Sequence, residues 1–224
     1  MDADEDRELQ ARARRHAALA EPVRLRIMDL LVQGDLSPTE LGRRLGLPSN
    51  LLAHHLNVLE AEQLIRRDRS EGDGRRSYVR LDGRPPLESG RPRTLTARRV
   101  VFVCTANSAR SQLAQALWGA ASPVPAVSAG THPAERVSPA AVDVAARHGL
   151  DLSQAVPRLV DDRLAASDLI ITVCDRAHEE YPATALHWSV PDPVRVGTTA
   201  AFDAAFSELE DRVSRLAPLV RLAA

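Results

Sequence analysis

Residues 100–118, VVFVCTANSARSQLAQALW, decide the fold of the second half of the chain. Four apolar residues, three of them β-branched, lead to Cys104, a pattern typical of a buried parallel strand. Five small or polar residues and Arg110 follow, and from Ser111 onward apolar side chains recur at helical spacing. The stretch therefore predicts a strand, a tight loop and a helix, with a cysteine and an arginine at the two ends of the loop.

The spacing between Cys104 and Arg110 suits the binding of an oxyanion. A loop of this length before a helix can direct its backbone N–H groups inward, where the positive end of the helix dipole also points. Arg110 adds a planar fork of donors that matches two oxygens of a phosphate-like group. The same positive field favours a thiolate, which the Ser111 hydroxyl can hydrogen-bond, so we expect a nucleophile that shares one cradle with its substrate. The alternative is a buried cysteine at a strand end and a surface arginine.

The loop CTANSARS resembles the active-site loop of the low-molecular-weight protein tyrosine phosphatase superfamily, which includes arsenate reductases of the same fold. The resemblance implies Cys104 as the nucleophile, Ser111 as the hydroxyl that tunes the thiolate, and Asn107 as the residue that holds the loop in shape. Arg110 and the loop amides would bind the oxyanion, which makes the expected oxyanion-binding residues Thr105, Ala106, Asn107, Ser108, Ala109 and Arg110. Many relatives carry a second cysteine directly before the arginine, where this chain has alanine.

After residue 99, strand patterns alternate with helix patterns. We expect strands over residues 124–129, 168–173 and 186–190 and helices over residues 138–148 and 201–222. Such alternation favours a doubly wound parallel sheet whose site lies at the carboxyl ends of the strands.

Cys174 and Asp192 are further candidates for this site. Cys174 ends the apolar run DLIITVC at the same sheet edge as Cys104, so it is a candidate resolving thiol, although a small buried residue is the alternative. Asp192 precedes a proline in HWSVPDPV, where the resemblance implies a general acid on a loop over the cradle. In similar thioredoxin-linked reductases a third cysteine stands at the place of Tyr181. We therefore expect either a direct disulfide between the two cysteines or an external thiol such as mycothiol.

The residues after Asp192 bear on the substrate. The resemblance places aromatic side chains here in the phosphatase branch, where they wall a phosphotyrosine ring. This chain has Val194, Arg195 and Val196 instead, which favours arsenate over phosphotyrosine.

Composition limits the class of protein. The 224 residues suffice for two modest domains, and the formal net charge of -1 predicts no overall basic field for a nucleic acid. Two cysteines in so long a chain argue against a disulfide scaffold. The N-terminus is charged, and no apolar stretch reaches membrane length, so we expect a cytoplasmic protein.

The N-terminal part of the chain predicts helices in close succession. Residues 4–20 form a charged amphipathic pattern that needs a packing partner. In the following segment Gly34 suits the end of one helix, Ser37 begins a capping box for a helix over residues 37–45, and a third helix is expected over residues 48–63. A short helix, a tight turn and a second helix make the helix-turn-helix pattern.

Two short strand patterns, LIRRDRS and RSYVRL, follow around an Asp-Gly turn and predict a wing. The wing offers arginines for backbone phosphates: Arg66, Arg67, Arg69, Arg75, Arg76 and Arg80. On the third helix Leu52, Leu56 and Leu59 are expected to face the core. The outward face, expected to contact DNA, carries Ser49, Asn50, Ala53, His54 and Asn57.

Residues 19–81 resemble an ArsR-type winged helix-turn-helix repressor domain, especially in EPVRLRIMDLL, LLAHHLNVLE and the wing. The resemblance implies a homodimer on an inverted DNA repeat, with Ser49, Asn50, Ala53 and His54 nearest the bases. The alternative is a winged helix that serves for dimerisation or protein binding. Metal-sensing relatives hold arsenite with cysteines on the helix that here reads SPTELGRRL, and this segment has none. Neighbouring His54 and His55 point about 100° apart on a helix, so we expect no metal site.

These patterns together predict an α+β winged helix domain over residues 1–83, a linker over residues 84–98 rich in Pro, Gly and Arg, and an α/β doubly wound domain over residues 99–224. We interpret the chain as an arsenate reductase fused to a DNA-binding regulator of arsenic resistance. It would bind no cofactor and would use an external thiol system, mycothiol with mycoredoxin or thioredoxin. A tyrosine phosphatase and a non-catalytic oxyanion sensor are the alternatives.

Overall fold

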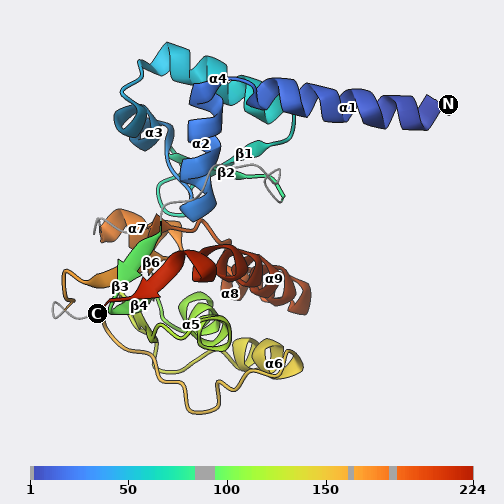
Figure 1. Cartoon of the computed structure of the whole chain (residues 1–224). Coiled ribbons are helices and arrows are strands. Elements are labelled where there is room, and N and C mark those ends of the chain that lie inside the picture. Colours follow the sequence, from blue (N-terminus) through green and yellow to red (C-terminus); the bar gives the residue numbers. More distant parts are fainter. Residues whose placement is uncertain (1–2, 84–93, 161–163, 182–185, 224) are drawn as a thin grey trace. The chain divides into compact units, whose positions relative to one another are not determined.

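The computed structural model of the chain describes residues 3–83, 94–160, 164–181 and 186–223 (Figure 1). The chain forms two compact units. The first contains Met1–Arg69 and Arg75–Pro92, and the second contains Ser70–Gly74 and Arg93–Ala224.

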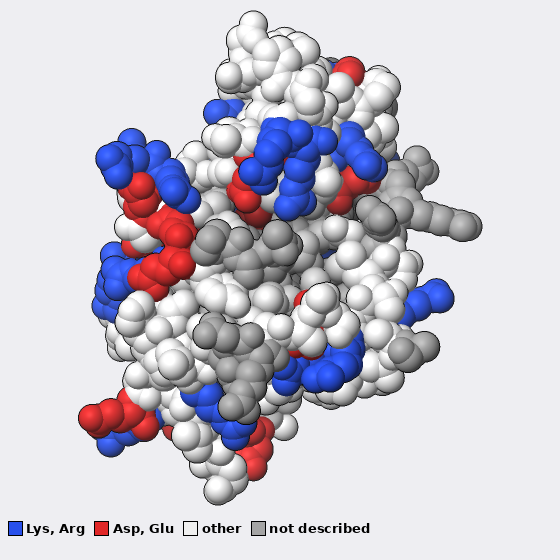
Figure 2. Space-filling view, turned by 90° about the vertical axis from the view of Figure 1, so that its left-hand side faces the viewer, with Lys and Arg blue, Asp and Glu red and all other residues white. Residues whose placement is uncertain are grey.

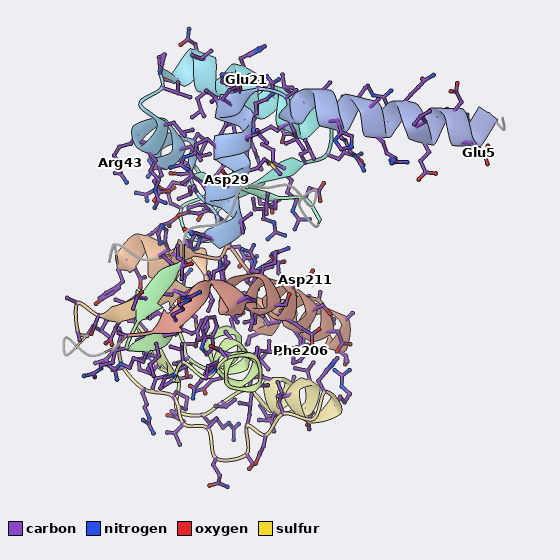
Figure 3. All side chains as sticks on the ribbon, in the orientation of Figure 1. Glu5, Glu21, Asp29, Arg43, Phe206 and Asp211 are labelled. Carbon is purple, nitrogen blue, oxygen red and sulfur yellow. The ribbon has the colours of Figure 1, made fainter. Side chains whose placement is uncertain are left out.

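The first unit contains four helices. They are α1 (Ala3–Leu19), α2 (Pro22–Gln33), α3 (Pro38–Leu45) and α4 (Ser49–Ala61). Glu21, at the start of α2 in Figure 3, caps that helix by accepting the Arg24 N–H at 2.9 Å. The predicted capping box of α3 is confirmed, because Ser37 and Glu40 bond each other's backbone N–H groups. Gly34 does end α2, but with an extended φ of 175° that any residue can adopt.

The wing and the core complete the first unit. Strands β1 (Ile65–Arg69) and β2 (Ser77–Leu81) pair antiparallel. Leu36, which lies outside both strands, forms an isolated bridge to Val79 of β2. The core is aliphatic, and its fully buried side chains come from α2, α3, α4 and the wing: Ile27, Met28, Leu31, Leu41, Leu52, Leu56, Leu59, Ile65 and Val79. The predicted inward face of α4 is therefore confirmed.

The second unit is built on a four-stranded sheet with the order β5-β4-β6-β7, in which all neighbours are parallel. Its strands are β4 (Arg99–Cys104), β5 (Ala126–Gly130), β6 (Asp168–Thr172) and β7 (Leu186–His187). Because Cys104 pairs with Gly130 at the carboxyl ends of β4 and β5, the predicted site lies at this edge of the sheet. The predicted parallel-sheet class is confirmed.

Five helices surround this sheet: α5 (Arg110–Ala121), α6 (Pro139–Arg147), α7 (Asp175–Glu180), α8 (Pro193–Val196) and α9 (Thr199–Leu216). Helices α5 and α6 both pack against α9, and Figure 1 shows the three as one group. The core between them and the sheet is aromatic: Phe102 contacts Trp118 and Trp188 with ring centroids 5.8 and 5.7 Å apart. Phe206 of α9, labelled in Figure 3, is buried and stacks on His148.

Two sequence predictions differ from the structure at the end of the chain. The predicted helix over residues 201–222 ends at Leu216, because a short 3-10 turn containing Pro218 follows and proline cannot continue the helical hydrogen bonds. The next residues form β8 (Val220–Leu222), which pairs parallel with β3 (Leu95–Ala97). The end of the predicted linker is therefore a strand, whereas residues 84–93 lie outside the described residues.

Strand β7 is also shorter than the predicted strand over residues 186–190. Its sheet pairing ends at His187, and the Val190 N–H bonds the Trp188 carbonyl within its own segment at 2.9 Å. This tight turn directs the segment toward the cysteine loop.

Candidate active site

The loop after β4 turns its carbonyl groups away from Cys104. The carbonyls of Cys104, Thr105 and Ala106 accept backbone N–H groups of residues 131, 132 and 134 at 3.0, 2.8 and 2.9 Å. In a trans peptide the N–H points opposite to the C=O, so the N–H groups of the next residues point inward. The Asn107 N–H does so, since it lies 3.1 Å from the Cys104 sulfur. The loop is therefore a cradle of inward N–H donors, as its sequence predicts.

Asn107 shapes this cradle. Its φ is 48°, in the left-handed region that asparagine tolerates better than most residues. Its side chain is fully buried and bonded at both ends: Nδ2 donates to Ser111 Oγ at 2.8 Å, and Oδ1 accepts the Arg158 N–H at 2.8 Å. Gln112 Nε2 donates to the Asn107 carbonyl at 3.1 Å. The loop is thus fixed from both its inner and outer sides.

The environment of Cys104 favours a thiolate. The sulfur is buried and lies 3.0 Å from Ser111 Oγ. Since Ser111 Oγ already accepts a hydrogen bond from Asn107, its own proton is available to the sulfur. Hydrogen bonds from a hydroxyl and a backbone N–H stabilise a negatively charged sulfur.

Gly130 allows the neighbouring strand to approach the loop closely. A Cβ atom at this position would lie 2.6 Å from the Thr105 carbonyl oxygen and 3.0 Å from the Asn107 nitrogen. Backbone atoms on both sides exclude any side chain here.

Arg110 begins α5 and is largely buried. Nη1 donates to the Val190 carbonyl at 2.9 Å, and Nη2 lies 2.9 Å from Asp192 Oδ2. Burial opposes the charge, but the sulfur atoms of Cys174 and Cys104, in their ionised form, and the Asp192 carboxylate raise the pKa of Arg110 above its ordinary value. The guanidinium is therefore a permanent, oriented cation beside the nucleophile.

Asp192 is brought to the site by the turn after β7. Its Oδ1 accepts the Val194 N–H at 3.0 Å and so caps α8, while Oδ2 faces Arg110. The structure thus places the predicted acid within reach of any oxygen that the guanidinium holds.

Cys174 lines the same cavity as Cys104, Arg110 and Asp192. Its sulfur caps the first turn of α7, where it accepts the Ala177 N–H at 3.4 Å, and it lies 3.4 Å from Thr105 Oγ1. Burial raises the pKa of the Cys174 thiol, against the opposing attraction of Arg110. The second cysteine is therefore close to the loop but held mainly as a thiol.

The predicted DNA-contacting residues of the first unit lie on α4 and in the wing. Ser49, Asn50, Ala53, His54 and Asn57 are all exposed on α4, and Arg75 and Arg76 are exposed in the wing. Asn57 accepts Arg67 Nη2 at 2.6 Å. The expectation for Arg80 is wrong, because its side chain is only 4% exposed and lies 2.9 Å from Asp68. A buried arginine that is already paired with a carboxylate on its own sheet is not available to a phosphate.

Several residues of the site carry no sequence motif. Gln112 and the segment around Arg158 support the loop through Asn107. Asp175 and His187 form a buried pair next to Cys174. The only sequence signal for this pair was the HW of HWSVPDPV, which points to a resemblance and gives no role.

The charge of the chain is mixed at its surface. Figure 2 shows arginine side chains next to acidic ones on the face that it presents. Within the described parts of the chain, no helix is long and apolar enough to cross a membrane.

Three features define a cysteine-dependent enzyme site for an oxyanion: a buried cysteine at a strand end, N–H groups that point inward, and an oriented guanidinium at a helix start. The profile described as low molecular weight phosphotyrosine protein phosphatase matches residues 99–223, more than half of the chain, and a helix-turn-helix domain profile matches residues 19–68. The chain belongs to the low molecular weight phosphotyrosine protein phosphatase family and carries a helix-turn-helix domain fused to the enzyme domain. The predicted fusion is confirmed.

The similar proteins match about half of this chain. An arsenate reductase of Halalkalibacterium halodurans is 32% identical over 126 residues, which are 52% of this chain and 89% of the relative. An arsenate reductase of Brevibacillus brevis is 36% identical over 105 residues, or 43% of this chain and 77% of the relative. A solved arsenate reductase structure from Archaeoglobus fulgidus is 31% identical, with a TM-score of 0.45 over 54% of this chain and 99% of that chain.

Proposed function

We propose that the second unit is an arsenate reductase and that the first unit binds operator DNA as a regulator of arsenic resistance. The observation that carries the enzymatic proposal is the pair of cysteines that line one cavity, of which Cys104 lies within hydrogen-bond distance of the Ser111 hydroxyl and the Asn107 N–H. A phosphatase needs only the first, whereas reduction of arsenate needs two sulfur atoms to supply two electrons. The names of the sequence relatives support the same substrate.

The first step is nucleophilic. Arsenate would be bound by Arg110 and the inward N–H groups of the loop. The Cys104 thiolate would form a bond to arsenic while one arsenate oxygen leaves as water, with Asp192 supplying its proton. The product is a thiol ester of arsenic(V) on Cys104, and no electron has yet been transferred to arsenic.

The second step is the reduction. A second thiolate attacks the Cys104 sulfur, a sulfur–sulfur bond forms, and the sulfur–arsenic bond breaks with its electron pair remaining on arsenic, which leaves as arsenite. Cys174 is the proposed second thiol, and mycothiol is the alternative if an external thiol acts first. The resulting disulfide is reduced by thioredoxin or by mycoredoxin, respectively.

Parallel assays test the reaction. The purified chain is given arsenate with thioredoxin and its reductase, arsenate with mycothiol and mycoredoxin, or a phosphotyrosine analogue. We expect arsenite in at least one of the first two assays. Phosphate release without arsenite would assign the site to the phosphatase reaction instead. If no assay yields a product, the site would be that of a non-catalytic oxyanion sensor.

The DNA-binding proposal rests on the exposed face of α4 and the exposed wing arginines. We propose that a homodimer, formed through the first unit, reads an inverted repeat with the α4 face. Fluorescence anisotropy with genomic DNA fragments from the chain's own locus gives the affinity as a function of salt. Arg76→Ala should lower the slope of log K against log salt by about one, because one phosphate contact is lost. Unchanged affinity and slope would remove the wing from the interface.

A further inference from the structure

A buried polar network lies beside Cys174 and takes no part in the steps above. Asp175 Oδ1 lies 3.0 Å from His187 Nε2, and the two side chains are 3% and 1% exposed. On the other side of the ring, His187 Nδ1 lies 3.0 Å from Thr172 Oγ1, which is 3.1 Å from His178 Nδ1. The two imidazoles stack with centroids 4.1 Å apart. So many buried polar groups are stable only because they form hydrogen bonds with one another.

The members of this network surround Cys174 along the chain. Thr172 stands two residues before the cysteine, Asp175 one residue after it and His178 four residues after it. All are joined through His187, which comes from a different strand. The turn that carries the thiol is therefore fixed from both sides by one imidazole.

The same network reaches the segment that orients the arginine. Asp175 also accepts a hydrogen bond from Ser189. Burial acts to raise the pKa of the Asp175 carboxyl, but the hydrogen bonds from His187 and Ser189 hold this pKa below its ordinary value. The next residue, Val190, accepts the hydrogen bond from Arg110 Nη1. One carboxylate thus ties the thiol-bearing turn to the segment that holds the guanidinium.

One tautomer of His187 satisfies both of its ring contacts. His187 Nε2–H donates to Asp175, and Nδ1 accepts the Thr172 hydroxyl proton, while His178 Nδ1–H donates to Thr172 Oγ1. A glutamine at position 187 keeps one donor and one acceptor, whereas alanine removes both.

We propose that His187 and Asp175 are positioning residues, which hold the Cys174 sulfur against Thr105 for its attack on the Cys104 adduct. The inference rests on the proposed resolving role of Cys174. In this step the Cys174–Cys104 bond forms and the Cys104–arsenic bond breaks, with the electron pair passing to arsenic. A displacement of the attacking sulfur by about 1 Å slows such a step about a hundredfold.

The test uses His187→Ala, His187→Gln and, as a matched control, His148→Ala, a histidine that does not line the cavity. The chain has two cysteines, so mass spectrometry follows alkylation of each one separately. We expect His187→Ala to raise the alkylation rate of Cys174 about tenfold and to change that of Cys104 much less, because the released turn opens more often. His187→Gln should restore the slow rate, and the control should behave as wild type.

The same variants are then given one equivalent of arsenate without external reductant. We expect His187→Ala to form the Cys104–Cys174 disulfide about tenfold more slowly than wild type, while hydrolysis of p-nitrophenyl phosphate, which does not use Cys174, falls much less than disulfide formation. Faster alkylation of both cysteines with loss of hydrolysis would show general unfolding and would overturn the positioning role. Unchanged rates at Cys174 would also overturn it. Absence of the disulfide in wild type would instead overturn the proposed resolving role of Cys174.

Discussion

The backbone N–H of Asn107 donates to the sulfur of Cys104 at 3.1 Å, and this contact depends on a left-handed φ of 48° at Asn107. The strained backbone turns the N–H group inward, and the side-chain hydrogen bonds to Ser111 and Arg158 hold it there. The nucleophile is therefore prepared by the shape of the loop before any substrate binds.

Substitution of Asn107 should separate strain from hydrogen bonding. Asn107→Gly tolerates the positive φ but loses the side-chain hydrogen bonds. Asn107→Ala loses these hydrogen bonds and also tolerates the positive φ less well. We expect both variants to lower kcat/KM for p-nitrophenyl phosphate about tenfold or more, because each frees the loop. Thermal unfolding should show Asn107→Ala as the less stable of the two by about 1 kcal/mol. Full activity in Asn107→Gly would contradict the assigned role of the side chain.

Gly130→Ala should disturb the same loop from the neighbouring strand. The added Cβ would meet the Thr105 oxygen at 2.6 Å, so the loop must shift. We expect a loss of about 1–3 kcal/mol in the free energy of unfolding and strongly reduced turnover. Gly119→Ala on α5 is the control, because a Cβ there meets nothing within 4 Å, and it should stabilise the helix by about 0.5–1 kcal/mol. Equal behaviour of the two variants would refute the close approach.

Asp168 should contribute stability that depends on pH. Its buried side chain accepts Arg99 Nη2 at 2.9 Å and the Ala165 N–H at 2.9 Å. Burial would raise the pKa of Asp168, but these partners lower it. The stabilisation is therefore fully present above the unfolded-state value of about 3.9 and is lost as the pH falls through the lower folded-state value.

We expect Asp168→Asn to lower the free energy of unfolding by about 1–2 kcal/mol at pH 7, because solvent screens the partly exposed Arg99 that is left without its carboxylate. The difference from wild type should shrink below about pH 4. Asp203→Asn breaks an exposed ion pair with Arg147 and should cost less than about 1 kcal/mol. Urea unfolding at several pH values measures both, and a pH-independent penalty for Asp168→Asn would contradict the assignment.

The resolving step should accelerate with pH. Because burial raises the pKa of Cys174, little of its thiolate is present at neutral pH, and the thiolate fraction rises only in alkaline solution. Rapid-quench measurement should follow formation of the Cys104–Cys174 disulfide after addition of arsenate. Because the pKa of Cys174 lies above the ordinary thiol pKa of about 8.5, the rate should still increase above pH 8.5. A rate that levels off below pH 7 would show a Cys174 that is already ionised.

Local patterns in the sequence were sufficient for the cradle and insufficient for its supports. The strand, loop and helix of residues 100–118 and the capping box at Ser37 depend on contacts between near neighbours, which spacing records. Arg80 was misjudged because alternation in a strand does not say which face is covered. The buried Asp175–His187 pair joins the start of α7 to β7, twelve residues apart, so no local pattern marks it.

The ends of the second domain show the same limit. Strand β3 falls in a segment with linker-like composition and forms because β8, more than a hundred residues later, pairs with it. Local propensity cannot record such a partner.

The most direct test of the central claim compares arsenite formation by wild type with arsenite formation by Cys104→Ser. Each protein is supplied with both reductant systems together. Serine keeps the size of the side chain but not the nucleophilic, redox-active sulfur, so the fold should be preserved while both steps fail. We expect multiple turnovers of arsenate in wild type and none in Cys104→Ser, with equal thermal unfolding of the two proteins. Absence of arsenite in wild type, or equal formation in Cys104→Ser, would contradict arsenate reduction at this site.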